Sequence, residues 1–139
     1  MKTIFYSIIL VFTLQTAAQE QLNWVTSNEL ALQESATQNK PVFVFVTDQQ
    51  NSEALKTINE HIFKSAQFSE LKSKMILLKI DISDAQSSKV RLGVHYTKQF
   101  TAPGLSLINK YGNNTVEPLV IITPENCAAF LELINENLQ

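Results

Sequence analysis

The chain has 139 residues and a formal net charge of −2, and its composition is 45% hydrophobic and 17% charged. That length suits one domain with a substantial core, and the composition excludes a disordered chain. The basic residues form no stripe, so nothing in the sequence predicts binding to nucleic acid. The three glycines form neither a GxGxxG nor a P-loop pattern, so no phosphate-binding loop is expected.

The first 18 residues have the pattern of a secretory signal peptide. Lys2 supplies the positive start, residues 4–14 are mostly apolar, and residues 16–18 place small side chains before a cleavage point. The alternative is an uncleaved membrane anchor, but the apolar run is too short to span roughly 30 Å of hydrocarbon. We therefore expect a signal peptide at 1–18 and a mature domain at 19–139, secreted or periplasmic and free of the membrane after cleavage.

Helices and strands alternate along the rest of the chain. The patterns predict a helix at 27–38, a strand at 42–46, a helix at 52–62 that resumes at 66–72, a strand at 75–82, a short helix at 87–92, strands at 105–108 and 115–122, and a helix from 123 onward. Thr26 and Glu29 have the spacing of a capping box at the first helix. Leu30, Ala31 and Ala36 of that helix are available to a core.

The stretch 40–55 organises the predicted fold. Residues 42–46 are apolar at every position, as in a strand that is buried on both faces, and the polar loop 47–51 then leads into a helix. Folds of the α/β class place their chemistry in such loops. This loop, however, offers no strong nucleophile, no histidine and no phosphate-binding glycine.

Two prolines mark the last predicted elements. Pro118 cannot donate a ladder hydrogen bond, so the 115–122 strand, which forms a hairpin with the 105–108 strand, is expected at a sheet edge. Residues 123–125, Thr-Pro-Glu, predict a helix start with a cap, a proline at the first position and an acid against the dipole.

Cys127 is the only cysteine of the chain, so neither an internal disulfide nor a dithiol can form, although export would permit one. It lies on the apolar stripe of the last predicted helix with Phe130, Leu131 and Ile134. One interpretation is a small buried core residue. The other is a single reactive thiol that forms a mixed disulfide with a partner, favoured by the nearby helix N-terminus and opposed by burial.

Residues spaced along positions 22–137 carry a family likeness. They are Trp24 before the first helix, Lys40-Pro41-Val42 at the central strand, Phe63 at the end of the next helix, Lys79-Ile80-Asp81 at the second strand, Tyr96, Pro103 and the segment Leu105–Gly112. Together they resemble the thioredoxin-like superfamily, especially its exported members of the thioredoxin-7 kind. The resemblance implies an α/β fold with a central mixed sheet of four to five strands, flanked by helices, and a C-terminal antiparallel hairpin and helix.

The defining motif of that family, CxxC at the start of the helix after the central strand, is absent. Counting forward from the central strand places it at Asn51 and Ala54, whereas counting back from the end of the helix places it at Ser52 and Leu55. A thioredoxin-type reaction needs a thiolate to attack a disulfide and a second thiol to resolve the mixed disulfide. Serine stays protonated near neutral pH, and leucine or alanine resolves nothing, so a degenerate site kept as a scaffold is expected.

Pro103 matches the cis-proline of the family, which faces the CxxC position. If the resemblance holds, the Ala102–Pro103 bond is cis and the backbone of Ala102 offers strand-like hydrogen bonds to an extended partner peptide. The alternative is an ordinary turn proline. Asp48 and Glu53 flank the site loop, where they either favour a basic partner segment or simply stabilise the start of the helix.

No metal or cofactor is expected. His61 and His95 are far apart and lack the spacing of metal ligands. Asp81, Asp84 and Glu34 could serve as acids of a hydrolase, but no base or nucleophile is paired with them.

Three hypotheses about function follow. The first is an exported binding or scaffold module without dithiol redox activity, which docks a protein or peptide over residues 48–55 and the Pro103 loop. The second is a protein related to thiol-disulfide oxidoreductases that acts through Cys127 alone or with the cysteines of a partner. The third is a hydrolase on the same fold, for which the sequence shows no catalytic constellation. The missing CxxC motif separates the first from a conventional oxidoreductase.

Overall fold

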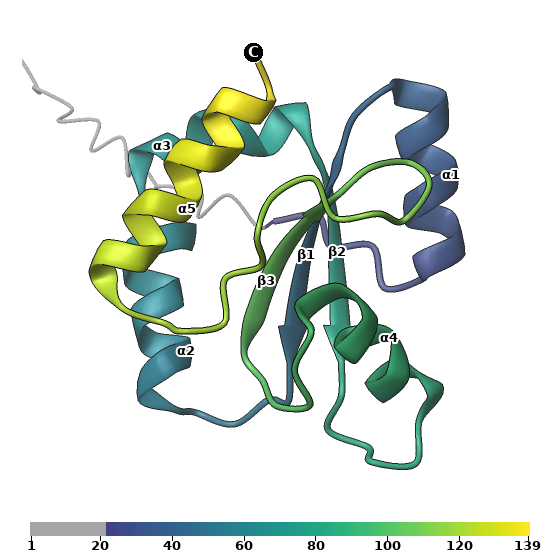
Figure 1. Ribbon diagram of the computed structural model, residues 1–139, viewed down its shortest axis with the longest axis vertical. Helices are drawn as coiled ribbons and strands as arrows, with labels where there is room; N and C mark the ends of the chain where they lie inside the picture. The colour runs from purple at the N-terminus through teal and green to yellow at the C-terminus, as the bar shows by residue number, and fades with distance from the viewer. Residues whose placement is uncertain (1–21) are drawn as a thin grey trace, which may run out of the picture.

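The computed structural model describes residues 22–139 (Figure 1), so the expected signal peptide lies outside the described part of the chain. The elements in order are α1 (Asn28–Gln38), β1 (Val42–Thr47), α2 (Glu53–Ile58), the π-helical turn η1 (Asn59–Phe63), α3 (Ala66–Leu71), the 3₁₀ turn η2 (Lys72–Lys74), β2 (Ile76–Asp81), α4 (Ser88–Thr97), β3 (Gly104–Ile108) and α5 (Pro124–Asn137). Within residues 22–139 no helix is both long and apolar enough to cross a membrane.

The sheet is mixed, and β1 is its central strand. The strand order is β2-β1-β3, with β2 parallel and β3 antiparallel to β1. All six residues of β1 are buried, as the unbroken apolar run predicts for a strand covered on both faces. A single residue, Val25, extends the far side of β2 by a parallel bridge to Leu78.

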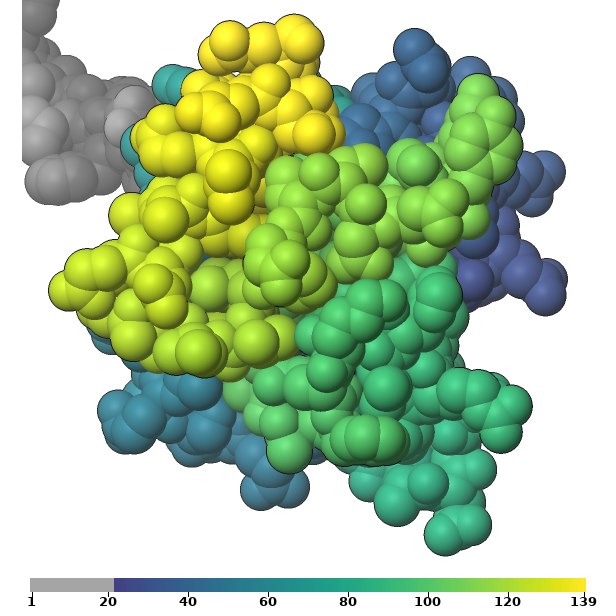
Figure 2. Space-filling model, in the orientation of Figure 1, coloured from purple at the N-terminus to yellow at the C-terminus, as the bar shows by residue number. Residues whose placement is uncertain are grey.

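The prediction of four to five strands is wrong for the described residues, which form a sheet of three. The segment expected as a fourth strand, 115–122, meets β3 only at isolated bridges, Leu105 with Leu119 and Ile108 with Asn114. Between the bridges β3 advances three residues and the segment five, so two extra residues break the ladder. Pro118 lies within this irregular stretch and has no N–H to donate. The segment lies between α5 and α4 in the space-filling view (Figure 2), and its two bridges place it along the edge of β3 that faces away from β1.

Helices cover both faces of the sheet (Figure 1). On the face of α2, α3 and α5, alternate residues of β1 join an aromatic cluster that includes Phe43, Phe45, Phe63 and Phe68. On the face of α1 and α4, the other residues of β1 join an aliphatic cluster with Tyr96. Each face buries enough apolar surface to fix the register of β1, because a slip by one residue would exchange the two clusters.

The start of α1 differs from the predicted capping box. Ser27, rather than Thr26, is the N-cap, and its hydroxyl accepts the backbone N–H of Leu30 at 3.3 Å. Leu30 is 46% exposed and Ala36 is also exposed, so of the three residues available to the core only Ala31 is buried. Serine and threonine both cap helices, and spacing alone does not choose between two neighbouring candidates.

The short helix expected at 87–92 extends to Thr97. Ser87 caps it by accepting the N–H of Lys89 at 3.2 Å. Tyr96, near its end, is buried, and its hydroxyl donates to Asn28 Oδ1 at 2.6 Å across to α1. That long-range contact holds the last turn of α4 in helical conformation and is not visible in local sequence patterns.

Candidate functional site

The loop after β1 and the loop before β3 lie at the same end of the sheet. Val46 pairs with Gly104 in the antiparallel register, so Pro103 is beside the end of β1 at Thr47 (Figure 1). The Ala102–Pro103 peptide bond is cis. Pro103 is buried, whereas Ala102 is half-buried. Residues 48–55 and the Pro103 loop, which are far apart in sequence, therefore border one surface.

Ser52 occupies the N-cap of α2. Its Oγ accepts the N–H of Leu55 at 3.1 Å, and its carbonyl accepts the N–H of Lys56 at 3.1 Å. Asn51 is exposed and outside the helix, and Ala54 and Leu55 are half-buried in its first turn. Of the two possible registers of the degenerate motif, the pair Ser52 and Leu55 is the one that begins at the helix cap.

Local hydrogen bonds fix the site loop. Thr47 Oγ1 accepts the N–H of Gln49 at 3.2 Å, and Asp48 Oδ1 accepts the N–H of Gln50 at 3.0 Å. Gln49 has a φ of 63°, in the left-handed region. Asp48 therefore organises its own loop through an Asx turn, and this local role needs no partner.

A side-chain contact ties the same loop to the end of β2. The amide Nε2 of Gln49 donates to Asp81 Oδ2, and Asp81 Oδ1 accepts the N–H of Ser83 at 2.9 Å. The hydrogen bond from the backbone N–H of Ser83 is the main reason that the pKa of Asp81 lies below its usual range, with a smaller contribution from Gln49. Asp81, considered above as a hydrolase acid, thus connects the loop after β1 with the loop after β2 by hydrogen bonds.

The loop before β3 is held from the side of α4. Gln99 Nε2 donates to the carbonyl oxygen of Pro103 at 3.3 Å, and the buried Thr97 hydroxyl donates to the carbonyl of Gly93 at 2.8 Å. A Cβ on Gly104 would come within 3.0 Å of Thr97 Cγ2 and 3.1 Å of Gln99 Nε2. A side chain at position 104 would therefore require Thr97 and Gln99 to shift by a few tenths of an ångström.

Cys127 lies in the first turn of α5 and has no exposed surface. It belongs to the apolar cluster on the α2, α3 and α5 face of the sheet. Burial raises the pKa of the Cys127 thiol, so the thiolate that disulfide exchange requires is disfavoured. The structure therefore matches the interpretation of Cys127 as a core residue more closely than that of a reactive thiol.

The histidines show no shared site. His61 and His95 are both exposed, on η1 and α4. Among residues 22–139, no group of three or more His, Cys, Asp or Glu side chains is placed to hold a metal ion.

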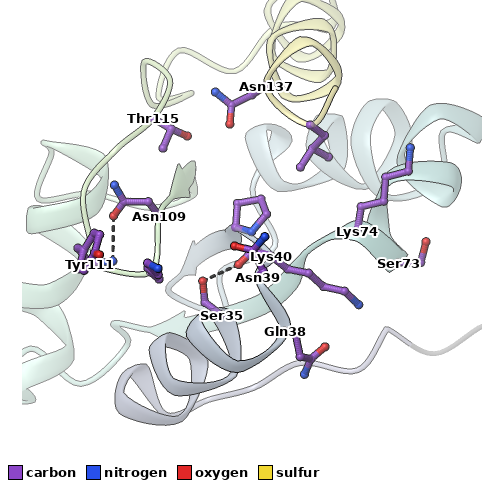
Figure 3. A pocket seen from close by; sticks show the side chains of 13 residues that line it. Ser35, Gln38, Asn39, Lys40, Ser73, Lys74, Asn109, Tyr111, Thr115 and Asn137 are labelled. Carbon is purple, nitrogen blue, oxygen red and sulfur yellow. Dashed lines mark hydrogen bonds between the residues drawn. The ribbon is translucent and has the colours of Figure 1, made fainter.

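A hollow of about 620 Å³ lies at the opposite end of the sheet (Figure 3). Its wall includes Lys40, Lys74 and Lys110 and no acidic residue. Helices α1 and α5 both end beside it, and lysines offset the partial negative charge of helix C-termini. The length of β1 separates this hollow from the site loop by roughly 17 Å. The lysines thus have a structural explanation that involves no ligand.

Sequence reasoning missed two features of the site. The contact from Gln49 to Asp81 joins residues 32 positions apart, so no local pattern announces it. Phe100, in the loop that leads to Pro103, is 79% exposed. Its place between a helix end and a proline was visible in the sequence, but a single exposed aromatic residue in a loop has no distinctive pattern.

The fold is a thioredoxin-like α/β fold, and Ser52 caps the helix that follows its central strand. Among solved structures, the chain is similar to a DsbH oxidoreductase, with a TM-score of 0.66 and 19% identity over 85% of both chains. It is also similar to a disulphide isomerase from Xylella fastidiosa Temecula1, with a TM-score of 0.54 and 14% identity over 83% of this chain and 99% of that one. No family model and no curated protein matches the chain. At these identities the likeness establishes the fold alone.

Proposed function

We propose that this chain is an exported thioredoxin-like domain without dithiol redox activity, which binds an extended segment of a protein or peptide. The binding surface is formed by residues 48–55 and by the loop through Ala102 and Pro103. The observation that carries the proposal is the serine at the cap of α2, in a chain whose only cysteine is buried elsewhere.

The chemistry of the site supports binding rather than electron transfer. Disulfide exchange needs an accessible thiolate and a second thiol within reach of the mixed disulfide. Ser52 uses its oxygen to cap α2, and Leu55 has no group that can attack a disulfide. Ala102 is half-buried at the same surface, and we propose that an extended segment pairs with its backbone as an added strand.

A second candidate function has one supporting observation. The printed titles of the two structural neighbours are those of an oxidoreductase and a disulphide isomerase. They favour a role in the disulfide cycle of another protein, through Cys127 or with the cysteines of that partner. The burial of Cys127 counts against a direct role for its thiol.

Photo-crosslinking in the native envelope tests the proposal. A photoreactive phenylalanine analogue at Ser52 should capture a discrete partner, whereas the same analogue at Tyr111, which is 75% exposed and at the other end of the sheet, should not. Capture at neither position, or equal capture at both, contradicts the proposal.

Enzyme assays separate the two candidates. The unmodified protein should not reduce insulin in the presence of dithiothreitol. Insulin reduction by the unmodified protein that disappears in Cys127→Ala would instead support a role in a disulfide cycle, because only a reactive thiol explains such a loss.

A further inference from the structure

Phe100 stands out from the loop that leads into Pro103. Its side chain is 79% exposed, and it is two residues before Ala102. The residues around it are held firmly, since Gln99 bonds to the Pro103 carbonyl and Lys98 closes α4 with its N–H on the carbonyl of Val94 at 2.8 Å. An aromatic ring is thus presented to solvent by a loop that hydrogen bonds anchor on both sides of it.

The ring borders a hollow of about 520 Å³ on the outside of α4. The hollow is lined by Val90 and Val94, one turn apart on the helix, and by Ala85 from the loop after β2. Phe100 forms the wall next to the Pro103 loop, and Arg91 contributes a positive charge. The hollow therefore combines apolar side chains with a cation and with the polar residues Gln86, Ser87 and Ser88, and Phe100 connects it to the loop that leads to Ala102.

Of residues 22–139, Arg91 is the only charged one that lines this hollow, although other charged residues lie near it in sequence. Arg91 makes no salt bridge among the described residues, and Lys89 is exposed on the same helix. Asp84, the nearest acidic residue before Ala85, uses Oδ1 to accept the N–H of Gln86 at 3.0 Å. The guanidinium of Arg91 is accordingly available to a carboxylate supplied from outside the chain.

A single exposed aromatic residue is common on protein surfaces and by itself requires no ligand. Three observations distinguish Phe100 from an ordinary exposed aromatic residue. They are the hydrogen bonds that anchor its loop, the adjoining hollow, and the short distance along the chain to Ala102. Two residues span at most about 7 Å of chain, which is comparable to the length of one large side chain. A segment that pairs with the backbone of Ala102 can therefore place a neighbouring side chain against Phe100 without changing its course.

We infer that Phe100, Val90 and Val94 form a specificity subsite for a bulky apolar side chain of the bound segment, with Arg91 receiving an acidic residue next to it. The occupant is an extended peptide segment with an aromatic residue followed by Glu or Asp. This inference rests on the proposed function, because it names the chemistry of the partner that the Ala102 surface binds.

Two blocked peptides serve as probes, of sequences Ser-Gly-Thr-Trp-Glu-Thr-Gly and Ser-Gly-Thr-Ala-Glu-Thr-Gly. Each is titrated into the ¹⁵N-labelled protein while the amide signals around Ala102 and Phe100 are followed. We expect both peptides to shift the Ala102 signal and the tryptophan peptide to bind about fivefold more tightly. Phe100→Ala should remove that advantage and leave the affinity of the alanine peptide unchanged.

Tyr111→Ala is the matched control, because Tyr111 is an aromatic residue of similar exposure, 75%, at the far end of the sheet. It should leave both affinities as they are. Arg91→Gln should weaken both peptides, which share the glutamate. All three side chains are exposed, so the variants should fold normally, and their amide spectra verify this.

The outcomes separate the two proposals. If the Ala102 signal shifts but the two peptides bind equally, or if Phe100→Ala leaves their difference intact, the subsite is wrong and the binding surface stands. If neither peptide shifts the Ala102 signal and Ser52 captures nothing by crosslinking, the subsite and the proposed function both fail.

Discussion

Introducing cysteines at Ser52 and Leu55 tests whether the start of α2 can support thiol-disulfide chemistry. Ser52 Oγ accepts the N–H of Leu55 at 3.1 Å at the N-cap of α2. A thiolate introduced by Ser52→Cys would accept the same N–H and lie at the positive end of the helix, so its pKa should be lowered.

The size of the effect follows from two contributions. The hydrogen bond from the N–H and the helix dipole are each worth about 1 kcal/mol to the charged form, so together they favour ionisation roughly 30-fold. At pH 7 the thiolate fraction then rises from about 3% to about half. A less basic thiolate is also a weaker nucleophile, which lowers the reactivity of each thiolate about fivefold. The net gain in reaction rate at pH 7 is therefore roughly threefold. Glu53, an exposed carboxylate next to the cap, is screened by water and reduces the gain only slightly.

Alkylation of a single-thiol protein measures the first step. In Ser52→Cys with Cys127→Ala, the midpoint of the rate against pH should lie more than one unit below that of Tyr111→Cys in the same background. Adding Leu55→Cys should then give insulin reduction, and the pair Asn51→Cys with Ala54→Cys, which misses the helix cap, should give much less. Equal midpoints at positions 52 and 111, or equal turnover by both pairs in folded proteins, would refute this reasoning.

Two further predictions concern the buried thiol of Cys127 and the hydrogen-bonded carboxylate of Asp81. Cys127 should react with a chromogenic disulfide at least roughly 10³ times more slowly in the native than in the denatured protein, because the thiol must be exposed by opening first. Cys127→Ser should destabilise by about 1–3 kcal/mol, more than Cys127→Ala at about 1 kcal/mol, as measured by urea unfolding. For Asp81, whose pKa is lowered mainly by the N–H of Ser83, the stabilisation is present above the unfolded-state pKa and is lost as the pH falls through the lower folded-state value. The free energy of unfolding of Asp81→Asn should therefore be lower than that of the parent at pH 7 and should approach the parent value below about pH 4. A difference that stays constant between pH 7 and acid pH would show that Asp81 does not act through its charge.

The central part of the fold could be predicted because it depends on burial patterns within single elements. The apolar run of β1 and the apolar stripe of α5 both appear in the structure as the sequence suggests, with Cys127 inside the core. Such patterns are local, and the residues that define them also form most of the contacts.

The edge of the sheet and the finer features of the site could not be predicted. The irregular segment around Pro118 depends on two extra residues relative to β3, which become visible only when the two bridges are known. The spacing of Thr26 and Glu29 predicts a cap one residue before Ser27, which is the N-cap of α1, because more than one residue of that loop can accept the free N–H groups. The hydrogen bond between Gln49 and Asp81 depends on the parallel register of β1 and β2, which brings Thr47 beside Asp81.

Ser52 and Leu55 lack the thiols that disulfide exchange requires, whereas the ordered loops around them fit the binding role that we propose. Serine is a better helix cap than most residues, so Ser52 contributes about 1 kcal/mol to the start of α2 while supplying no nucleophile. Gln99 donates a hydrogen bond to the carbonyl of Pro103, Gln49 donates one to Asp81 at the end of β2, and Phe100 is exposed in the loop that leads to Pro103. The fold itself depends on the two apolar clusters around β1, to which Ser52 does not belong. Neither cluster therefore requires a thiol at position 52 or 55, which is consistent with our proposal that this surface binds a partner rather than exchanging disulfides.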